Sequence, residues 1–288
     1  MTLPAEPPFA APSAEAVMAR AQTENFPVAS RLLRAAEREH LLAVYGFARL
    51  VDELGDSAPG DRLAALEWLS GELEAAFAGT ARHPLMCRLQ ASIEACRLSR
   101  APFERLIEAN RLDQRCHRYE TWEQLRKYCS LSADPVGELV LAVFGQSSPE
   151  RIALSDRICT ALQLTEHCQD VAEDLRRGRI YLPAEDLARF GCDEGELAAA
   201  HATPAVRAVL AFEVDRARGL IAAGLPLIGM LRGRARLGVA AFAAGGSAAL
   251  DAIERAAYDV LPGPPTAGDA RRLVALLATL QRPEARRR

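Results

Sequence analysis

The 288-residue sequence lacks the features that mark exported, membrane-spanning and disulfide-stabilised proteins. Its first residues, MTLPAEPPFAAPSAEA, have neither the basic start nor the continuous apolar core of a signal peptide. No apolar run reaches the roughly 18 residues that a spanning helix needs. The seven cysteines are odd in number and include no Cys-x-x-Cys pair, which argues against a disulfide framework and a zinc ribbon. We therefore expect a protein of the reducing cytoplasm.

The overall charge is too small to identify a charged partner. A net charge of -3 and a pI near 6.0 give no general attraction to nucleic acid or to anionic lipid. We therefore expect no nucleic-acid partner, and any membrane contact is expected to be peripheral, at the inner face of the cytoplasmic membrane. The basic residues 283–288 are interpreted as a solvated tail, with a contact to an anionic surface as the alternative.

The spacing of apolar residues predicts an all-α protein. After Phe26, apolar residues recur every three or four positions, and sustained alternation with a period of two is absent. Helix boundaries are marked by a capping box at Thr121, by Ser148-Pro149 and Thr203-Pro204, and by Gly145 after a helix end. We expect about ten to twelve helices. Without a long polar linker, the chain is expected to form a flexible leader (1–19), one helical catalytic domain (20–282) and the tail (283–288).

Two pairs of aspartates at helical spacing stand out because the segments around them are rich in Leu, Val and Ala. In LLAVYGFARLVDELGDS, Asp52 and Asp56 share an arc of about 60° with Tyr45 and Arg49, at about 100° per residue. The surrounding apolar residues leave little of this helix for solvent. We therefore expect the polar stripe to face an internal cavity.

A second polar stripe follows in LQLTEHCQDVAEDLRRGRIYLP, where Gln163, Glu166, Asp170 and Asp174 fall within about 80°. Buried carboxylates are costly unless cations compensate them. Because the donors are oxygens, a hard ion such as Mg²⁺ fits, and Mg²⁺ completes its shell with water and phosphate oxygens. The two stripes predict a metal-diphosphate site. The alternative is two solvated helix faces, where like charges four residues apart cost only about 0.2–0.5 kcal/mol.

The motifs around the two stripes resemble those of the squalene/phytoene synthase family. Y-x-x-x-R-x-x-D-x-x-x-D occurs early, YETWEQLRKYCSLSADPVGELV in the middle, L-Q-L-T-x-x-x-Q-D-V-x-x-D-x-x-x-G-R-I-Y-L-P later and AAYDVL near the end. The resemblance spans nearly the whole chain. It implies an isoprenoid synthase fold, with a single helical domain around a central cavity, and an enzyme that uses two or three Mg²⁺ ions.

The resemblance also implies roles for individual residues. The implied metal ligands are Asp52, Asp56, Glu166, Asp170 and Asp174. The implied catalytic residues are Tyr45, Arg49, Tyr128 and Gln163. The implied diphosphate-binding residues are Asn25, Arg49, Arg179, Tyr181 and Tyr258, although core packing would explain Tyr258 nearly as well.

Two departures from the common family pattern bear on the substrate. Residues 23–28 read TENFPV where many members resemble S-x-S-F, and ENFPV is similar to bacterial hydroxysqualene synthases. In the second motif, Glu166 replaces the usual Asn ligand but still offers oxygen to Mg²⁺. We therefore expect conversion of presqualene diphosphate to hydroxysqualene in squalene and hopanoid biosynthesis, with partner enzymes that make presqualene diphosphate and reduce hydroxysqualene.

Two alternatives to this activity remain. The first is a squalene or phytoene synthase that condenses two prenyl diphosphates, such as farnesyl diphosphate, head to head. The second is a non-catalytic assembly factor with the same fold, which would have no physical reason to keep four buried aspartates.

Several other polar residues have simpler explanations than catalysis. We expect His117 and His167 to be structural or surface residues, because each has charged neighbours in a helical segment. Cys129 and Cys168 are expected to be small core residues rather than nucleophiles.

Overall fold

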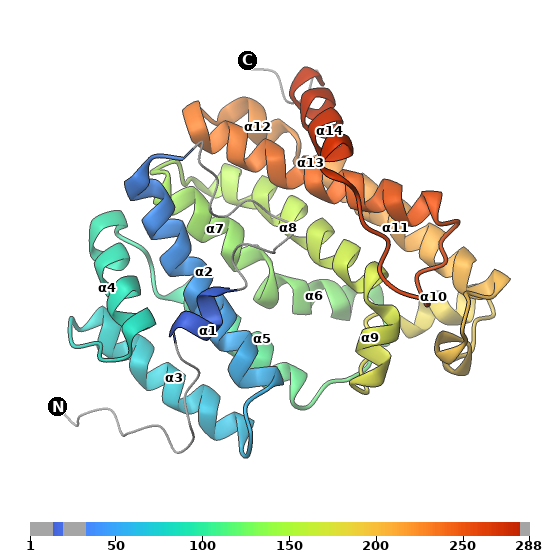
Figure 1. Cartoon of the computed structure of the whole chain (residues 1–288), viewed down its shortest axis with the longest axis horizontal. Helices are drawn as coiled ribbons and strands as arrows, with labels where there is room; N and C mark the ends of the chain where they lie inside the picture. Colours follow the sequence, from blue (N-terminus) through green and yellow to red (C-terminus); the bar gives the residue numbers. More distant parts are fainter. Residues whose placement is uncertain (1–13, 20–32, 283–288) are drawn as a thin grey trace. The chain divides into compact units, whose positions relative to one another are not determined.

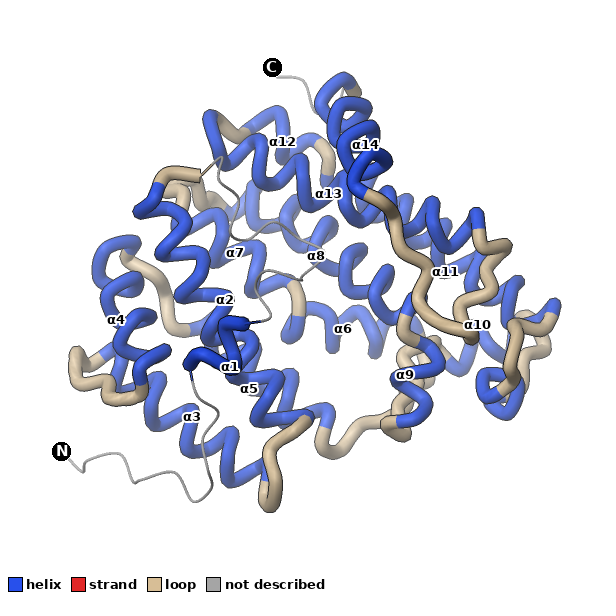
Figure 2. The backbone as a smooth tube through the Cα atoms, viewed as in Figure 1, coloured by secondary structure: helices blue, strands red, loops and turns tan. Residues whose placement is uncertain are grey.

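The computed structural model describes residues 14–19 and 33–282, and these residues form α-helices and one short 3-10 helix without any β-strand (Figure 1). The tube in Figure 2 shows the same helices in blue, joined by loops and turns in tan. The predicted all-α fold is confirmed. Fourteen α-helices occur in this part of the chain, more than predicted, because the four helices α1, α9, α10 and α12 have only five or six residues each. Asn25, the TENFPV string and the 283–288 tail lie outside the described residues.

The chain divides into two compact units. Unit 1 comprises residues 1–115 and 135–148, and unit 2 comprises residues 116–134 and 149–288. The last six residues of the predicted leader form helix α1 (Ala14–Ala19), whose Val17 is buried in the core of unit 1. The domain bounds inferred from the sequence stay a prediction.

Unit 1 is a bundle of helices packed around aromatic and leucine side chains. Phe47 meets Phe103 edge to face, with ring centroids 5.0 Å apart, and both side chains are fully buried. Helix α2, which carries the first acidic pair, packs against α1, α3, α4 and α5. Unit 1 contains the helices α1, α2 (Ala35–Asp56), α3 (Arg62–Phe77), α4 (Pro84–Cys96), α5 (Ala101–Asp113) and nearly all of α7 (Asp134–Val143).

Unit 2 contains α6 (Trp122–Ser132), α8 (Pro149–Gln169), α9 (Val171–Arg176), α10 (Ala184–Arg189), η2 (Glu194–Ala198), α11 (Pro204–Gly224), α12 (Pro226–Met230), α13 (Gly233–Arg255) and α14 (Asp269–Gln281). Helix α8 packs against both α11 and α13. A Cβ atom on Gly224 would lie 2.5 Å from Ile158, and one on Gly246 would lie 2.4 Å from Leu162. These two glycines therefore allow α11 and α13 to approach α8 closely.

The helix boundaries expected from capping residues are confirmed. Thr121 accepts a hydrogen bond from the Gln124 backbone N–H at 3.3 Å, and Thr203 accepts one from the Val206 N–H at 3.2 Å. Helix α8 begins at Pro149, and Gly145 follows α7 with a φ of 63°. Local sequence chemistry thus sets the ends of these helices.

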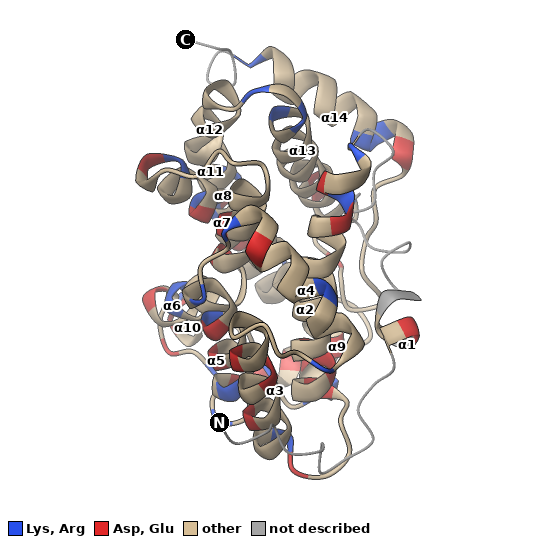
Figure 3. Ribbon diagram, turned by 90° about the vertical axis from the view of Figure 1, so that its left-hand side faces the viewer, with Lys and Arg blue, Asp and Glu red and all other residues tan. Residues whose placement is uncertain are grey.

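The helices of each unit carry both charged and apolar residues. Acidic and basic residues occur together along many of them (Figure 3). Among the described helices, α13 is long and apolar enough to cross a membrane by length and composition, with a mean hydropathy of 1.3 over its best window. Half of that window is buried inside the protein, as in a core helix, so this is weak evidence for a membrane span.

All seven cysteines lie in the described part of the chain and are free; Cys129 and Cys168 are buried, as expected for small core residues.

A buried ion cluster joins α10 to α11 in unit 2. The guanidinium of Arg216 lies 2.8 Å from Asp186 and 2.6 Å from Glu213, and it also covers the ring faces of Trp122 and Phe212. The side chain of Glu213 is fully buried. Burial raises the pKa of Glu213 to about 8 despite the neighbouring Arg216, and Asp186 adds to the rise.

Glu213 should make the protein less stable as the pH rises. Its ordinary pKa is 4.5 and its folded-state pKa is about 8, so over this interval the unfolded chain releases a proton that the folded chain retains. Its contribution to stability is therefore complete below pH 4.5 and lost as the pH rises through about 8. Glu213→Gln removes this titration, and its urea midpoint should fall less over the same pH range than that of the wild type. Equal changes in the two proteins would contradict this assignment.

Candidate active site: two acidic pairs

The first acidic pair lies near the C-terminal end of α2 in unit 1. Asp52 and Asp56 are one helical turn apart, and Tyr45 and Arg49 precede them on the same half-buried stripe. Arg49 Nη1 lies 3.7 Å from Asp52 Oδ2, and Asn110 Nδ2 donates to Asp52 Oδ1 at 3.4 Å. The structure therefore confirms that α2 carries the four residues and adds Asn110 from α5.

The surroundings of Asp52 disfavour its charge. Burial, together with the nearby carboxylates of Asp56 and Asp113, raises the pKa of Asp52 to about 6, although Arg49 and Asn110 oppose the rise. The side chain nevertheless keeps 49% of its surface accessible, so a cation can reach it. A bound cation would stabilise the ionised form of this carboxyl group.

Helix α5 reaches the first pair because α2 has a glycine at the crossing point. A Cβ atom on Gly55 would lie only 2.1 Å from Asn110 Oδ1. Gln114 Nε2 donates to the Gly55 carbonyl at 2.9 Å, and Asp113 is buried beside the pair. Asn110 and Asp113 were not predicted, because they come from a helix whose packing against α2 has no local sequence signal.

The second acidic pair spans the junction of α8 and α9 in unit 2. The sequence predicted one continuous helical stripe of Gln163, Glu166, Asp170 and Asp174. The structure corrects this prediction, because α8 ends at Gln169 and α9 begins at Val171. Helical hydrogen bonds continue across the junction, from the Asp170 N–H to the Glu166 carbonyl at 2.9 Å and from the Asp174 N–H to the Asp170 carbonyl at 2.8 Å. Asp170 is therefore the residue between the two helices, at the N-cap of α9, and Asp174 lies on α9.

Asp170 resembles Asp52 in its electrostatics. Burial, together with the Asp174 and Glu173 carboxylates, raises the pKa of Asp170 to about 6. His167 and Arg177 oppose the rise. Each acidic pair thus contains one aspartate whose negative charge the protein does not fully compensate.

An aromatic cluster adjoins the second pair. The ring of His167 stacks on Tyr181 with centroids 4.0 Å apart, and Tyr119 and Tyr128 pack against Tyr181 at 5.8 and 5.4 Å. All four side chains are buried. The structure thus brings the predicted residues Tyr128 and Tyr181 together and adds His167 and Tyr119.

His167 also contacts the polar residues of the motif. Its Nδ1 lies 3.9 Å from Asp174 Oδ2, and its Nε2 lies 3.4 Å from Gln163 Nε2. His117, by contrast, is exposed on the surface. Of the two histidines discounted in the sequence, His167 is thus the one placed among the candidate site residues.

The remaining predicted residues of unit 2, Arg179 and Tyr258, both follow the second acidic pair in the sequence. Arg179 is buried, and its backbone N–H donates to the Asp174 carbonyl at 2.9 Å. Tyr258 follows α13 and is half-buried; burial raises its pKa, with Glu254 adding to the rise. The expected contact of Tyr258 with diphosphate stays a prediction.

The donor chemistry of both pairs fits Mg²⁺. Within residues 14–19 and 33–282, no three His, Cys, Asp or Glu side chains form a group that could hold a metal ion by themselves. Mg²⁺ commonly takes only one or two carboxylates and fills its other positions with water and phosphate oxygens. Asp52 and Asp170, whose pKa values are raised, are therefore each suited to bind an ion that is also held by a diphosphate.

The family is decided by the extent of a sequence match. The sequence model of squalene/phytoene synthase matches residues 19–277. The chain belongs to the squalene/phytoene synthase family. Among its relatives in this family, the hydroxysqualene synthase of Rhodopseudomonas palustris is 34% identical over 214 residues, which cover 71% of this chain and 70% of the relative. The phytoene synthase of Arthrospira platensis is also 34% identical over 214 residues, covering 68% of each chain.

Solved structures of squalene/phytoene synthases share the fold. Squalene synthase HpnC from Alicyclobacillus acidocaldarius is 47% identical, with a TM-score of 0.79 over 85% of this chain and 94% of that chain. A dehydrosqualene synthase in complex with ligand has a TM-score of 0.82 at 23% identity, over 92% of this chain and 93% of that chain. The isoprenoid synthase fold implied by the sequence motifs is confirmed.

Proposed function

We propose that this member of the squalene/phytoene synthase family converts presqualene diphosphate to hydroxysqualene and diphosphate. The observation that carries the proposal is the presence of two acidic pairs, in each of which burial raises the pKa of one aspartate to about 6. Such carboxylates are suited to a cation-bound anionic substrate. The ENFPV string and the hydroxysqualene synthases among the relatives support this choice of substrate.

The reaction requires a leaving group to be stabilised and a cation to be protected. The carbon–oxygen bond to diphosphate breaks, diphosphate leaves with the electron pair, and the rearranged cation adds water and loses a proton. Mg²⁺ bound at Asp52, Asp56, Glu166, Asp170 and Asp174 would supply positive charge against the leaving diphosphate. Arg49 and Arg179 would bind its oxygens.

The aromatic cluster suits the cationic stage. The rings of Tyr128, Tyr181 and His167 form a buried apolar surface next to Asp174. Ring faces attract cations, and burial keeps water away from them. We therefore assign these rings to one wall of the substrate site.

The second candidate is head-to-head condensation of two prenyl diphosphates. It is favoured by the phytoene synthase of Arthrospira platensis, which matches this chain at the same identity as the hydroxysqualene synthase. An assembly factor is disfavoured, because the chain retains all four aspartates of the two pairs.

Product identification separates the two activities. Purified protein is incubated with Mg²⁺ and either presqualene diphosphate or farnesyl diphosphate, and the products are identified by mass spectrometry. We expect hydroxysqualene from presqualene diphosphate and no coupled product from farnesyl diphosphate. Formation of a coupled triterpene from farnesyl diphosphate alone would overturn the assignment.

Glu166 should affect the metal requirement. Glu166→Asn restores the usual family ligand and removes one negative charge from the second motif. We expect the Mg²⁺ concentration for half-maximal activity to rise by about threefold to tenfold, because a charged ligand is lost. An unchanged Mg²⁺ profile would mean that Glu166 is not a ligand.

The cellular setting belongs to the same proposal. We place the enzyme in the cytoplasm, drawing its apolar substrate from the inner face of the cytoplasmic membrane. The enzymes that supply presqualene diphosphate and reduce hydroxysqualene would be its neighbours in the pathway.

A further inference from the structure

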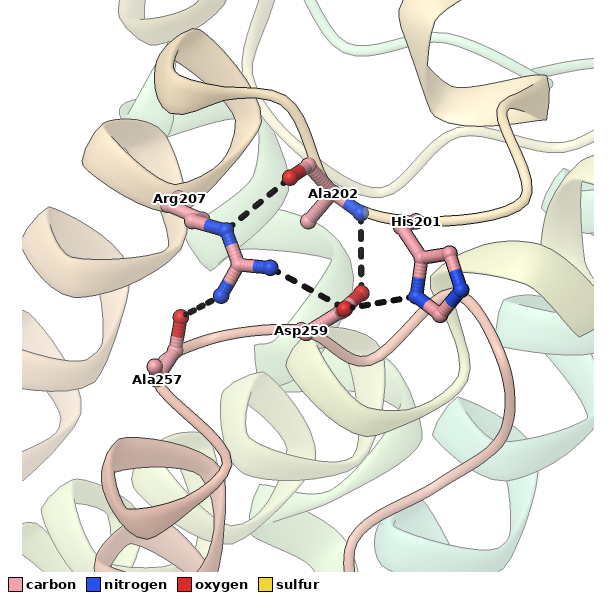
Figure 4. A network of polar contacts seen from close by, with 5 residues as sticks. All are labelled: His201, Ala202, Arg207, Ala257 and Asp259. Atoms are coloured by element: carbon pink, nitrogen blue, oxygen red, sulfur yellow. Dashed lines mark hydrogen bonds and ion pairs between the residues drawn. The ribbon is translucent and has the colours of Figure 1, made fainter.

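A polar network in unit 2 joins the corner before α11 to the segment after α13 (Figure 4). Asp259 accepts hydrogen bonds from the Ala202 N–H at 2.8 Å and from Arg207 Nη2 at 3.0 Å, and its Oδ2 lies 2.9 Å from His201 Nδ1. Arg207 also donates to the carbonyls of Ala202 and Ala257. Four of these contacts therefore join two segments at least fifty residues apart. The fifth, from Arg207 to the Ala202 carbonyl, lies within one segment.

The network encloses a strained stretch of backbone. Ala257 and Tyr258 have φ values of 50° and 60°, in the left-handed region that residues with a Cβ atom disfavour. Such residues persist where surrounding contacts fix them. Here Arg207 binds the carbonyl of Ala257, and Asp259 is fixed directly after Tyr258.

Both segments continue toward the second acidic pair. After Asp259 the chain reaches Pro265, whose carbonyl accepts a 2.6 Å hydrogen bond from the buried Gln169, the residue before Asp170. Before His201 the chain forms η2, which packs against α9, the helix of Asp174. The network therefore ties together two segments that both contact the acidic pair's helices: the segment after Asp259 contacts the end of α8, and the segment before His201 contacts α9.

We propose that Asp259 and Arg207 are positioning residues for the second acidic pair, acting through the Gln169–Pro265 hydrogen bond and through the packing of η2 on α9. Because Asp170 and Asp174 are the proposed metal ligands, the functional consequence rests on the proposed function. The effect of the network on the local order of residues 168–177 does not depend on the proposed function.

Hydrogen–deuterium exchange of the metal-free protein tests the positioning role. In Asp259→Asn, which removes the charge but keeps the shape, we expect amides of residues 168–177 to exchange about tenfold faster, while those in the middle of α11 and α13 are unchanged. His201→Ala removes one exposed contact and should give a smaller increase in the same region. Unchanged exchange in residues 168–177, or a uniform increase throughout unit 2, would overturn the proposal.

Asp251→Asn is the matched control. Asp251 on α13 pairs with Arg218 on α11 at 2.9 Å, and this contact joins an exposed carboxylate to a half-buried guanidinium on the body of the two helices. We expect its exchange in residues 168–177 to equal that of the wild type. An increase as large as that in Asp259→Asn would mean that any charge loss between these helices loosens the motif.

Activity then tests the consequence separately. Asp259→Asn should raise the Mg²⁺ concentration for half-maximal turnover by about threefold to tenfold, and Asp251→Asn should leave it unchanged. Wild-type protein that turns over no prenyl diphosphate would refute the proposed function and leave the exchange result standing. Faster exchange with an unchanged Mg²⁺ profile would refute the link from this network to metal binding.

Discussion

Replacing Asp170 with alanine is expected to lower turnover of a prenyl diphosphate by about 100- to 1,000-fold. Under the proposed function, the change removes a carboxylate that would hold the cation that neutralises the leaving group. Several kcal/mol of transition-state stabilisation correspond to this range, at about 1.4 kcal/mol per factor of ten. Single-turnover rates at saturating substrate measure the effect directly.

Asp269→Asn is the control for Asp170→Ala. Asp269 lies at the start of α14, is exposed and pairs with Arg272 at 3.9 Å. Removing this charge should change turnover by less than about twofold, because exposed ion pairs contribute little. Asp52→Ala should match Asp170→Ala. Full activity in either alanine variant, with unchanged circular dichroism, would refute the metal-diphosphate site.

Gly55→Ala should damage both stability and activity. The new Cβ atom would lie 2.1 Å from Asn110 Oδ1, so α2 and α5 must separate or Asn110 must turn away from Asp52. We expect unfolding to become easier by about 1–3 kcal/mol. We also expect turnover to fall by about tenfold or more, because the geometry of the first pair changes. Urea unfolding and steady-state kinetics measure the two effects.

Gly71→Ala is the matched control in the same unit. Gly71 lies inside α3, and a Cβ atom there would meet no atom within 4 Å. Alanine should therefore stabilise the protein by about 0.4–1 kcal/mol through helix propensity and leave turnover unchanged. Equal losses of stability in the two variants would mean that the contact with Asn110 is not the cause.

The sequence was sufficient for the features that depend on local chemistry. The three-to-four-residue spacing predicts the helices, and Thr121 and Thr203 predict where two of them begin. The stripe of Tyr45, Arg49, Asp52 and Asp56 needs only the geometry of one helix. These inferences hold because the residues involved are close in sequence.

The features that the sequence did not predict depend on packing between segments that are distant in sequence. Asn110 lies 58 residues from Asp52, and its approach depends on the absence of a side chain at Gly55. Charged neighbours in a helical segment predicted a structural or surface role for His167, whereas its stacking on Tyr181 depends on how the chain between them folds. The end of α8 at Gln169 was also missed, since the apolar spacing continues unbroken across Asp170.

The glycine contacts of α8 restrict the movement of the helix that leads into the second acidic pair. Ile158 packs against Gly224 of α11, and Leu162 packs against Gly246 of α13. Sliding or rotation of α8 would force both side chains against helix backbone at the same time. Because the Asp170 and Asp174 N–H groups bond back to the Glu166 and Asp170 carbonyls, a shift of α8 would also move the acidic pair, so these two glycines help to fix the position of the pair within unit 2.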